Sequence, residues 1–450
     1  MIDMTEGNIN KGILKFALPM ILGNIFQQVY NLVDSIVVGK FIGADALASV
    51  GSSFAIIVFI NSIIIGLSMG VGIILSQFYG SKDFDKFKET TFLSFIFIGC
   101  ITIFLMVLSL YFIDSILLLF NMPLELINDS KDYLIIILLG LIFTYIYNLS
   151  TSLLRAIGDS KRPLYFLIIA SIINIVLDLL FVIKFNLGIK GVAIATVIAQ
   201  AVSGFISIIY TYIKLDFLRF DRKCIKFHKD TLKSVIKYST LTALQQSIMN
   251  FGILIVQSLV NTFGSTVMAA FAAGVKIDSI AYMPVQDFGN AFSTFVAQNK
   301  GAEKIDRIKS GVTSSIKTII IFCLISSTLI LAFSKQIMLL FVDKHETSVI
   351  SLGVEYISVV AIFYVLIGFL FMFYGLYRGL GLLKISIILT VVSLGTRVLL
   401  AYILSSTSLG ASGIWWSIPI GWGLADILGF VLYKKFIIKC NKQNYIKVAK

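Results

Sequence analysis

The sequence predicts an all-α polytopic membrane protein with 12 transmembrane helices in two pseudo-symmetric six-helix bundles. Of the 450 residues, 58% are hydrophobic and only 14% are charged, and the mean hydropathy is +0.95. The segments 46–81 and 238–275 contain no Asp, Glu, Lys, Arg or His, and each exceeds the ~20 apolar residues that a helix needs to cross a bilayer. Such continuous runs exclude a β-barrel, whose strands alternate in hydrophobicity over about 10 residues.

Charge clusters and breaks at Gly, Pro or Asn divide the chain into individual spans. Each is long enough to cross ~30 Å of hydrocarbon as a helix. The spans are expected at 13–39, 46–78, 91–113, 133–154, 164–183, 191–213, 235–262, 267–298, 312–334, 354–377, 384–405 and 411–433.

Basic residues between the spans predict the orientation. Of 37 Lys and Arg residues, six lie in loops on one side and two lie within spans, which leaves 29 on the side of both termini. Because basic residues favour the cytoplasmic side, both termini are expected to be cytoplasmic in an integral protein of the inner (plasma) membrane. The six outer residues are Lys40, Lys131, Lys184, Lys190, Lys335 and Lys344, and the two within spans are Lys276 and Arg397.

The most basic connection separates an N-lobe (1–213) and a cytoplasmic linker (214–234) from a C-lobe (235–450). Because each lobe holds an even number of spans, the lobes are expected to be parallel repeats with a cavity between them. Three motif pairs recur at nearly constant offset: Gln77-x-x-Gly80 with Gln298-x-x-Gly301 at 221, LGIKG at 187–191 with LGASG at 409–413 at 222, and RAIG at 155–158 with RGLG at 378–381 at 223.

Four polar residues of the N-lobe predict a cation site. Asp34 and Asp178 each lie six residues before an outer lysine, and Thr196 lies six residues after one, so all three are expected about 9 Å below those lysines. Asn174 precedes Asp178 by four residues and shares its helical face. Carboxylate, amide and hydroxyl oxygens suit Na⁺, whereas two desolvated acids placed close together also suit H⁺. No other metal and no cofactor is expected.

The C-lobe does not repeat this site. By the repeat offsets, Asp34 aligns with Ile255 or Val256, Asp178 with Ala401, and Asn174 with Arg397. A buried structural ion pair is favoured for Arg397, and its candidate partners are Asp278, Asp287 and Asp426.

Prolines and large apolar residues inside the spans give further expectations. Pro19, Pro284 and Pro419 are expected to kink their helices. Because Pro19 shares a helix with Asp34, a bend there is expected to respond to the state of that acid. Met283 and Phe292 are expected to line a hydrophobic cavity.

Several function classes are excluded. The net charge of +13 does not indicate a nucleic-acid partner, because the basic residues fall between apolar runs. The cysteines Cys100, Cys224, Cys323 and Cys440 are too far apart for a metal cluster and are expected to be free thiols. No G-x-S-x-G, H-E-x-x-H or Walker motif occurs, so neither hydrolysis nor ATP binding is indicated.

Four features carry a family resemblance: the segments 18–43 (LPMILGNIFQQVYNLVDSIVVGKFIG), 153–163 (LLRAIGDSKRP) and 174–178 (NIVLD), and the paired Gln-x-x-Gly motifs. Together they resemble the multidrug and toxic compound extrusion (MATE) family of cation-coupled antiporters over essentially the whole chain. The resemblance implies a cavity that opens alternately to each side and the export of amphipathic, often cationic, drugs in exchange for Na⁺ or H⁺. It also carries the family's first-lobe cation site onto Asp34, Asn174, Asp178 and Thr196.

One branch of that family also uses acids in the seventh and tenth spans. Here the segments 238–275 and 356–377 contain none, so coupling through the second lobe is not expected. The polar candidates in the seventh span are Gln245, Gln246 and Gln257, and Gln245 and Gln257 are expected in the substrate cavity.

Two alternatives to a drug antiporter stay open. A flippase for lipid-linked saccharides, from the same superfamily, would need a strongly cationic cavity, which only Lys276 and Arg397 could supply. A membrane-embedded enzyme would need a nucleophile and base, or a metal cluster, at membrane depth. The leading expectation is a monomeric transporter in the lipid bilayer that has no enzymatic activity and no nucleic-acid partner.

Overall fold

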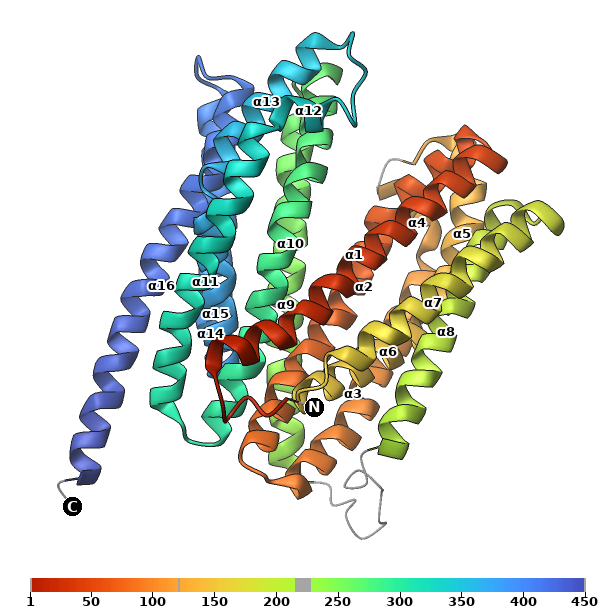
Figure 1. Ribbon diagram of the computed structural model, residues 1–450. Helices are drawn as coiled ribbons and strands as arrows, with labels where there is room; N and C mark the ends of the chain where they lie inside the picture. The colour runs from red at the N-terminus through yellow and green to blue at the C-terminus, as the bar shows by residue number, and fades with distance from the viewer. Residues whose placement is uncertain (1, 120–121, 215–227, 449–450) are drawn as a thin grey trace. The chain divides into compact units, whose positions relative to one another are not determined.

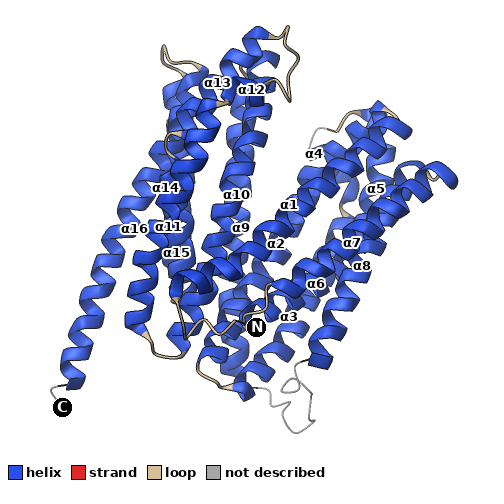
Figure 2. Cartoon of the chain, viewed as in Figure 1, coloured by secondary structure: helices blue, strands red, loops and turns tan. Residues whose placement is uncertain are grey.

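The computed structural model describes residues 2–119, 122–214 and 228–448. These residues form helices and turns and contain no strand (Figures 1 and 2). In this part of the chain, ten helices are long and apolar enough to cross a membrane, and the count rises to 12 if each of two bent helix pairs forms one span. The predicted fold class is confirmed.

The first half of the chain forms α1 (Ile9–Phe41), α2 (Ala44–Gly80), α3 (Phe84–Tyr111), α4 (Ile113–Leu119), η1 (Leu124–Leu126), α5 (Ile127–Leu139), α6 (Leu141–Ala156), α7 (Lys161–Leu179), η2 (Leu180–Lys184) and α8 (Gly188–Lys214). The second half forms α9 (Lys229–Asn261), α10 (Ser265–Gly301), α11 (Ile305–Ala332), α12 (Ser334–Met338), α13 (Thr347–Ala361), α14 (Tyr364–Gly379), α15 (Leu383–Ser405) and α16 (Ala411–Val448). Most of the predicted linker, residues 215–227, lies outside the described residues.

Contacts group the chain into two compact units. The first unit contains Met1–Ser247 with Ala297–Ile308, and the second contains Ile248–Val296 with Lys309–Lys450. The first unit therefore includes the beginning of α9 and the turn between α10 and α11, in addition to the helices of the sequence-defined N-lobe.

The internal repeat is visible in the backbone. Lys82 and Glu303 have φ values of 58° and 57°, and positive φ is uncommon for residues other than glycine. The two positions are related by the offset of 221 that relates the Gln-x-x-Gly motifs. Three glycine pairs at repeat positions also have positive φ: Gly43 (131°) with Gly264 (88°), Gly158 (85°) with Gly381 (70°), and Gly188 (55°) with Gly410 (52°).

Each half also contains one bent pair of helices. The pair α5 and α6 is bent by 44°, and the pair α13 and α14 is bent by 53°. Gly140 lies at the first break and Ile362 and Phe363 lie at the second, near the same repeat position. The two halves therefore share an irregularity that a straight-helix prediction misses.

The two Gln-x-x-Gly motifs contact each other inside the first unit. A Cβ atom on Gly80 would overlap the carbonyl oxygen of Gln298, and one on Gly301 would overlap the carbonyl oxygen of Gln77. The contact is reciprocal, as in a self-complementary twofold interface. Glycine at both positions allows the two backbones to approach this closely.

The N-terminal segment packs on the same region. Met4 is 1% exposed, and its N–H donates a hydrogen bond to Gln298 Oε1 at 3.1 Å. Its carbonyl oxygen accepts hydrogen bonds from Asn299 Nδ2 at 3.0 Å and from Arg307 Nε at 3.2 Å. Gln298 Nε2 in turn donates to the Ala156 carbonyl at 2.8 Å. These bonds join the chain's beginning, the end of α6 and the α10–α11 turn within the first unit.

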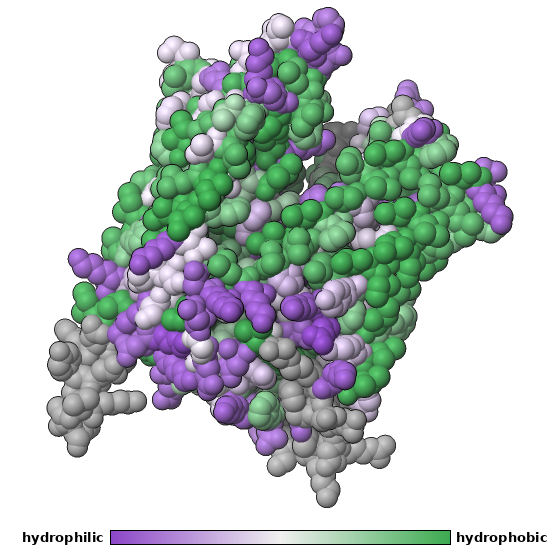
Figure 3. Space-filling model, in the orientation of Figure 1, coloured by the Kyte–Doolittle hydropathy of each residue, from purple (hydrophilic) through white to green (hydrophobic). Residues whose placement is uncertain are grey.

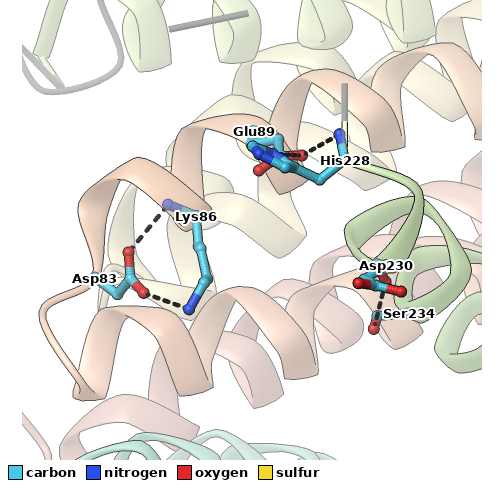
Figure 4. Close-up of polar contacts among 6 residues, drawn as sticks. All are labelled: Asp83, Lys86, Glu89, His228, Asp230 and Ser234. Atoms are coloured by element: carbon cyan, nitrogen blue, oxygen red, sulfur yellow. Dashed lines mark hydrogen bonds and ion pairs between the residues drawn. The ribbon is translucent and has the colours of Figure 1, made fainter. Parts of the chain in front are cut away.

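Polar contacts also position the starts of two helices in the first unit (Figure 4). Asp83 caps α3 by accepting a hydrogen bond from the Lys86 N–H at 3.1 Å. Glu89 is 7% exposed and accepts a hydrogen bond from the His228 N–H at 2.9 Å, immediately before α9. This bond anchors the end of the linker to α3.

The surface is suited to lipid. On the face drawn in Figure 3, hydrophobic side chains cover the flanks of the helices and hydrophilic side chains gather toward their ends. Large apolar side chains on α3, such as Phe104 and Val107, are 61% and 57% exposed. Soluble proteins rarely expose extended apolar surface, so this is an integral membrane protein.

Candidate functional site

The helices of the first unit carry the four predicted cation ligands. Asp34 lies near the end of α1, Asn174 and Asp178 lie on α7, and Thr196 lies on α8. Helix α7 packs against both α1 and α8. Immediately after Asp178 the chain changes to the π-helical turn η2, an irregularity that frequently occurs at functional sites.

The structure brings these four side chains together in two contacts. Asn174 Nδ2 donates a hydrogen bond to Thr196 Oγ1 at 3.5 Å. The carboxyl groups of Asp34 and Asp178, which we name the acid pair, lie within hydrogen-bonding reach of each other. A contact between two carboxyl groups is a hydrogen bond only when one of them carries a proton.

The oxygens of this site lack donors. Asp178 is fully buried and Asn174 is 2% exposed. Both carboxylate oxygens of Asp178, Oδ1 of Asp34 and Oδ1 of Asn174 are buried and accept no hydrogen bond from the described residues. Since buried polar groups are nearly always satisfied, four such oxygens in one place indicate a site for a positively charged species.

Apolar packing encloses the site at one end. Val38 lies one helical turn beyond Asp34, Val182 one turn beyond Asp178, and Val192 one turn before Thr196. These three valines belong to one buried hydrophobic cluster. The cluster shields the acid pair from solvent at the end of the unit that carries Lys40 and Lys190.

Two of the lysines at this end of the unit pair with other acids. Lys131 Nζ lies 2.6 Å from Asp114 Oδ1, and Lys190 Nζ lies 3.0 Å from Asp132 Oδ2. Neither lysine therefore neutralises the acid pair.

Two tyrosines of the site were missed from the sequence. Tyr30 on α1 and Tyr133 on α5 lie within electrostatic reach of both Asp34 and Asp178. Tyr30 had a signal, because it precedes Asp34 by four residues and shares its helical face. No sequence pattern indicates that Tyr133 lies near these acids, because its position depends on how α5 packs in the unit.

The second unit contains a different polar cluster. Asp278 Oδ2 on α10 accepts a hydrogen bond from the Tyr356 hydroxyl at 3.3 Å, and the Tyr364 side chain also bonds to Asp278. Since Tyr356 lies on α13 and Tyr364 on α14, Asp278 connects both parts of the bent pair. Arg397 on α15 lies within electrostatic reach of Asp278. We name Asp278 and Arg397 the charge pair.

The residues expected in the substrate cavity have varied environments. Gln245 is 1% exposed and Phe292 is fully buried. Phe292 stacks on Phe295 with ring centroids 5.9 Å apart. Gln257 Nε2 donates to Asn261 Oδ1 at 3.0 Å, and Met283 is half-buried.

The three prolines expected to kink their helices, Pro19, Pro284 and Pro419, lie inside α1, α10 and α16. Pro19, which is buried, lies inside the continuous helix α1. Cys100 and Cys323 are free thiols, whereas Cys224 and the side chain of Cys440 lie outside the described part. The described residues contain no group of three or more His, Cys, Asp or Glu side chains that could hold a metal ion.

Comparison with known sequences gives a family. The family model MatE matches residues 19–180 and 242–403, which together make up more than half of the chain. The chain is 28% identical over 440 residues to "Probable multidrug resistance protein YpnP" of Bacillus subtilis (strain 168), with 96% of each chain covered. It is 26% identical over 326 residues to the "FAD transporter" of Shewanella oneidensis, with 70% of each chain covered.

Comparison with solved structures supports the fold. "Crystal structure of MATE in the bent conformation" has a TM-score of 0.92 at 24% sequence identity and covers 98% of each chain. "Outward-facing conformation of a multidrug resistance MATE family transporter of the MOP superfamily" has a TM-score of 0.91 at 24% identity and covers 97% of this chain and 98% of that one.

Proposed function

The chain belongs to the MatE family of transporters, and from this premise we propose that it exports amphipathic or cationic compounds in exchange for Na⁺ or H⁺ bound at Asp34, Asn174, Asp178 and Thr196. As a member of that family it is a multidrug efflux transporter and not an enzyme. The proposal goes beyond this family-level function in three respects: the coupling ion, the site that binds it and the class of substrate.

The observation that carries the proposal is the set of buried oxygens without donors around the acid pair. Ionised together, Asp34 and Asp178 would repel each other in a site of low dielectric constant. A bound cation removes that cost. H⁺ would be shared between the two carboxyl groups, whereas Na⁺ would use both carboxylates with the oxygens of Asn174 and Thr196.

Exchange requires that the cation and the drug favour different states of the protein. A ligand with equal affinity for two conformations shifts no equilibrium, however tightly it binds. The acid pair provides a difference, because its net charge changes when the cation leaves. Pro19 lies on the same helix as Asp34, so we propose that α1 changes its bend when the cation binds and leaves.

The names of the relatives and the charges of the described residues support the proposed substrate class. The relative from Bacillus subtilis is named as a multidrug resistance protein. A lipid-linked saccharide would need cations that are free to bind diphosphate. Arg397 lies beside Asp278, and Lys276 lines a pocket that also contains Asp343 and Glu346. Each candidate cation thus has acids nearby, which favours the drug transporter over the flippase.

The orientation is part of the proposal, with both termini in the cytoplasm. The asymmetry of the basic residues supports it. The N-terminal segment also contacts Gln298 and Gly158, at helix ends predicted to lie on that same side. After the native cysteines are removed, a cysteine placed at Lys229 or Lys233 should react with an impermeant thiol reagent only from the cytoplasmic side. Labelling from outside would overturn the orientation.

Gradient-driven drug uptake into inside-out vesicles tests the coupling site. Asp34→Asn and Asp178→Asn keep the side-chain size but remove the charge, so neither variant should concentrate drug, although both should bind it in detergent. Asp45→Asn, at an exposed acid near the start of α2, is the matched control and should transport normally. Full uptake by both site variants would show that coupling occurs elsewhere.

A further inference from the structure

Asp426 is a buried acid that the proposed coupling mechanism does not use. It lies on α16 near the middle of the candidate span Ala411–Ile438 and is 3% exposed. Neither of its carboxylate oxygens accepts a hydrogen bond from the described residues. An acid in this position is either compensated by a bound species or costly to the fold.

The other acids within the candidate spans of the second unit have partners. Asp278 accepts a hydrogen bond from Tyr356 and lies beside Arg397. Asp287 also has an interaction partner, and Glu355 accepts a hydrogen bond from Ser412. Asp426 therefore needs an explanation of its own.

A cluster of hydroxyl groups lies near Asp426, with Tyr374 as its link to the acid. Tyr374 on α14 hydrogen-bonds to the side chains of Thr390 and Ser393 on α15 and lies within electrostatic reach of Asp426. Tyr374 and Ser393 are each 3% exposed, and Thr390 is fully buried. Helices α14, α15 and α16 pack against one another, so the cluster is enclosed by three helices.

The charged groups on these helices do not neutralise Asp426. Arg378 on α14 donates hydrogen bonds to the Tyr374 carbonyl at 3.1 Å and to Asn290 Oδ1 at 3.0 Å. Arg397 on α15 belongs to the charge pair, and Lys384 on α15 is exposed. Lys434 and Lys435 on α16 are exposed. The remaining titratable groups on these helices and on α13, among the side chains that the structure describes, are Glu355 and Tyr356 on α13, Tyr364 and Tyr377 on α14, Tyr402 on α15 and Tyr433 on α16.

We propose that Asp426 is a proton-binding site of the second unit, separate from the coupling site of the first unit. The proton makes the carboxyl group neutral, and the nearby Tyr374 hydroxyl, which Thr390 and Ser393 hold in place, offers an oxygen to which its O–H can donate. A proton suits this place better than a larger cation, because α14, α15 and α16 are tightly packed there.

The site makes the second unit sensitive to alkaline conditions. When the proton leaves, an unpaired negative charge remains at the centre of three packed helices. A group that binds its proton more tightly in the folded state than in the unfolded state stabilises the fold at low pH, and this contribution is lost as the pH rises. The folded protein should therefore lose stability at alkaline pH through Asp426.

Infrared spectroscopy of purified protein tests the site directly. The wild-type-minus-Asp426→Asn difference spectrum should show the carbonyl band of a protonated carboxylic acid at neutral pH, and the band should shift in D₂O. Tyr374→Phe keeps the acid but removes the nearby hydroxyl, so the band should remain and move in frequency. A carboxylate band in place of the acid band would overturn the proposal.

Thermal melting at several pH values gives a second, independent measurement. The melting temperature of the wild type should fall between neutral and alkaline pH, and Asp426→Asn should remove most of that fall. Asp45→Asn should melt like the wild type. An equal fall in Asp426→Asn and wild type would contradict the proposal. Neither measurement involves transport, so failure here is distinguishable from failure of the proposed function.

Discussion

The acid pair of the first unit and the charge pair of the second unit show two ways to bury a carboxylate in a membrane protein. Asp34 and Asp178 lie beside each other, with oxygens that lack donors. Asp278 lies beside Arg397 and accepts a hydrogen bond from Tyr356. The acid pair is not compensated by donors from the described residues, whereas the charge pair is compensated by the protein itself.

This difference shows how a repeated fold can separate two roles. The backbone repeats closely enough for Lys82 and Glu303 to share an unusual φ angle. The side chains do not repeat, because Arg397 occupies the position that corresponds to Asn174. We infer that one unit binds the coupling cation and that the charge pair stabilises the other unit.

The largest expected effect is on stability, at Arg397. Arg397→Ala leaves Asp278 without its cation, and removing one partner of a buried pair costs about 3–5 kcal/mol. The variant should give less folded protein and a lower melting temperature in detergent, and adding Asp278→Asn should recover part of the loss. A variant that folds normally but no longer exports drug would instead place Arg397 in the substrate site.

The next effect is stabilisation by the coupling cation. A ligand that binds only the folded state at 100 times its Kd stabilises it by about 2.7 kcal/mol. The melting temperature of wild type should therefore rise with Na⁺ if Na⁺ is the coupling ion, and this rise should disappear in Asp34→Asn. In the double variant Asp278→Asn/Arg397→Ala, the melting temperature should still rise with Na⁺. If it lost the rise, the second unit would take part in cation binding.

Thr196→Val separates the two candidate ions. The substitution removes one oxygen ligand and keeps the side-chain shape. If Na⁺ is bound, its affinity should fall about tenfold, or ~1.4 kcal/mol. If H⁺ is bound between the acids, transport should change less than twofold. Measured Na⁺ affinity and proton-driven uptake in the same variant decide between the ions.

The smallest expected effect is on the stability of the first unit. Asp178→Asn makes permanent the neutrality that a bound cation provides. Its free energy of unfolding should therefore lie within about 1 kcal/mol of that of the wild type. Thermal melting in detergent measures this. A loss as large as that of Arg397→Ala would show that Asp178 has a structural partner and would remove the contrast between the units.

Much of this arrangement could be predicted from the sequence. Span positions follow from apolar runs and charge clusters, and the depth of Asp34, Asp178 and Thr196 follows from their spacing to lysines. Helical geometry is regular, so spacing along one helix converts reliably into depth and face.

Contacts between helices could not be predicted in the same way. The choice of Asp278 beside Arg397 depends on how α10 and α15 pack, and three acids were equally compatible with the spacing. The same holds for Tyr133 beside the acid pair and for Phe292, whose ring stacks on Phe295 in the interior. The bent pairs were also missed, because a hydrophobic run looks the same whether its helix is straight or broken.

The most direct test of the central claim is cation release from purified protein when drug is added. Binding of drug and cation is reciprocal, so a drug that displaces the coupling ion must release it into solution. Wild type and Asp278→Asn/Arg397→Ala should release Na⁺ or H⁺ on drug addition, measured with radioactive sodium and a pH indicator, whereas Asp34→Asn and Asp178→Asn should release neither. Undiminished release from both acid-pair variants would contradict the assignment of the coupling site to the first unit.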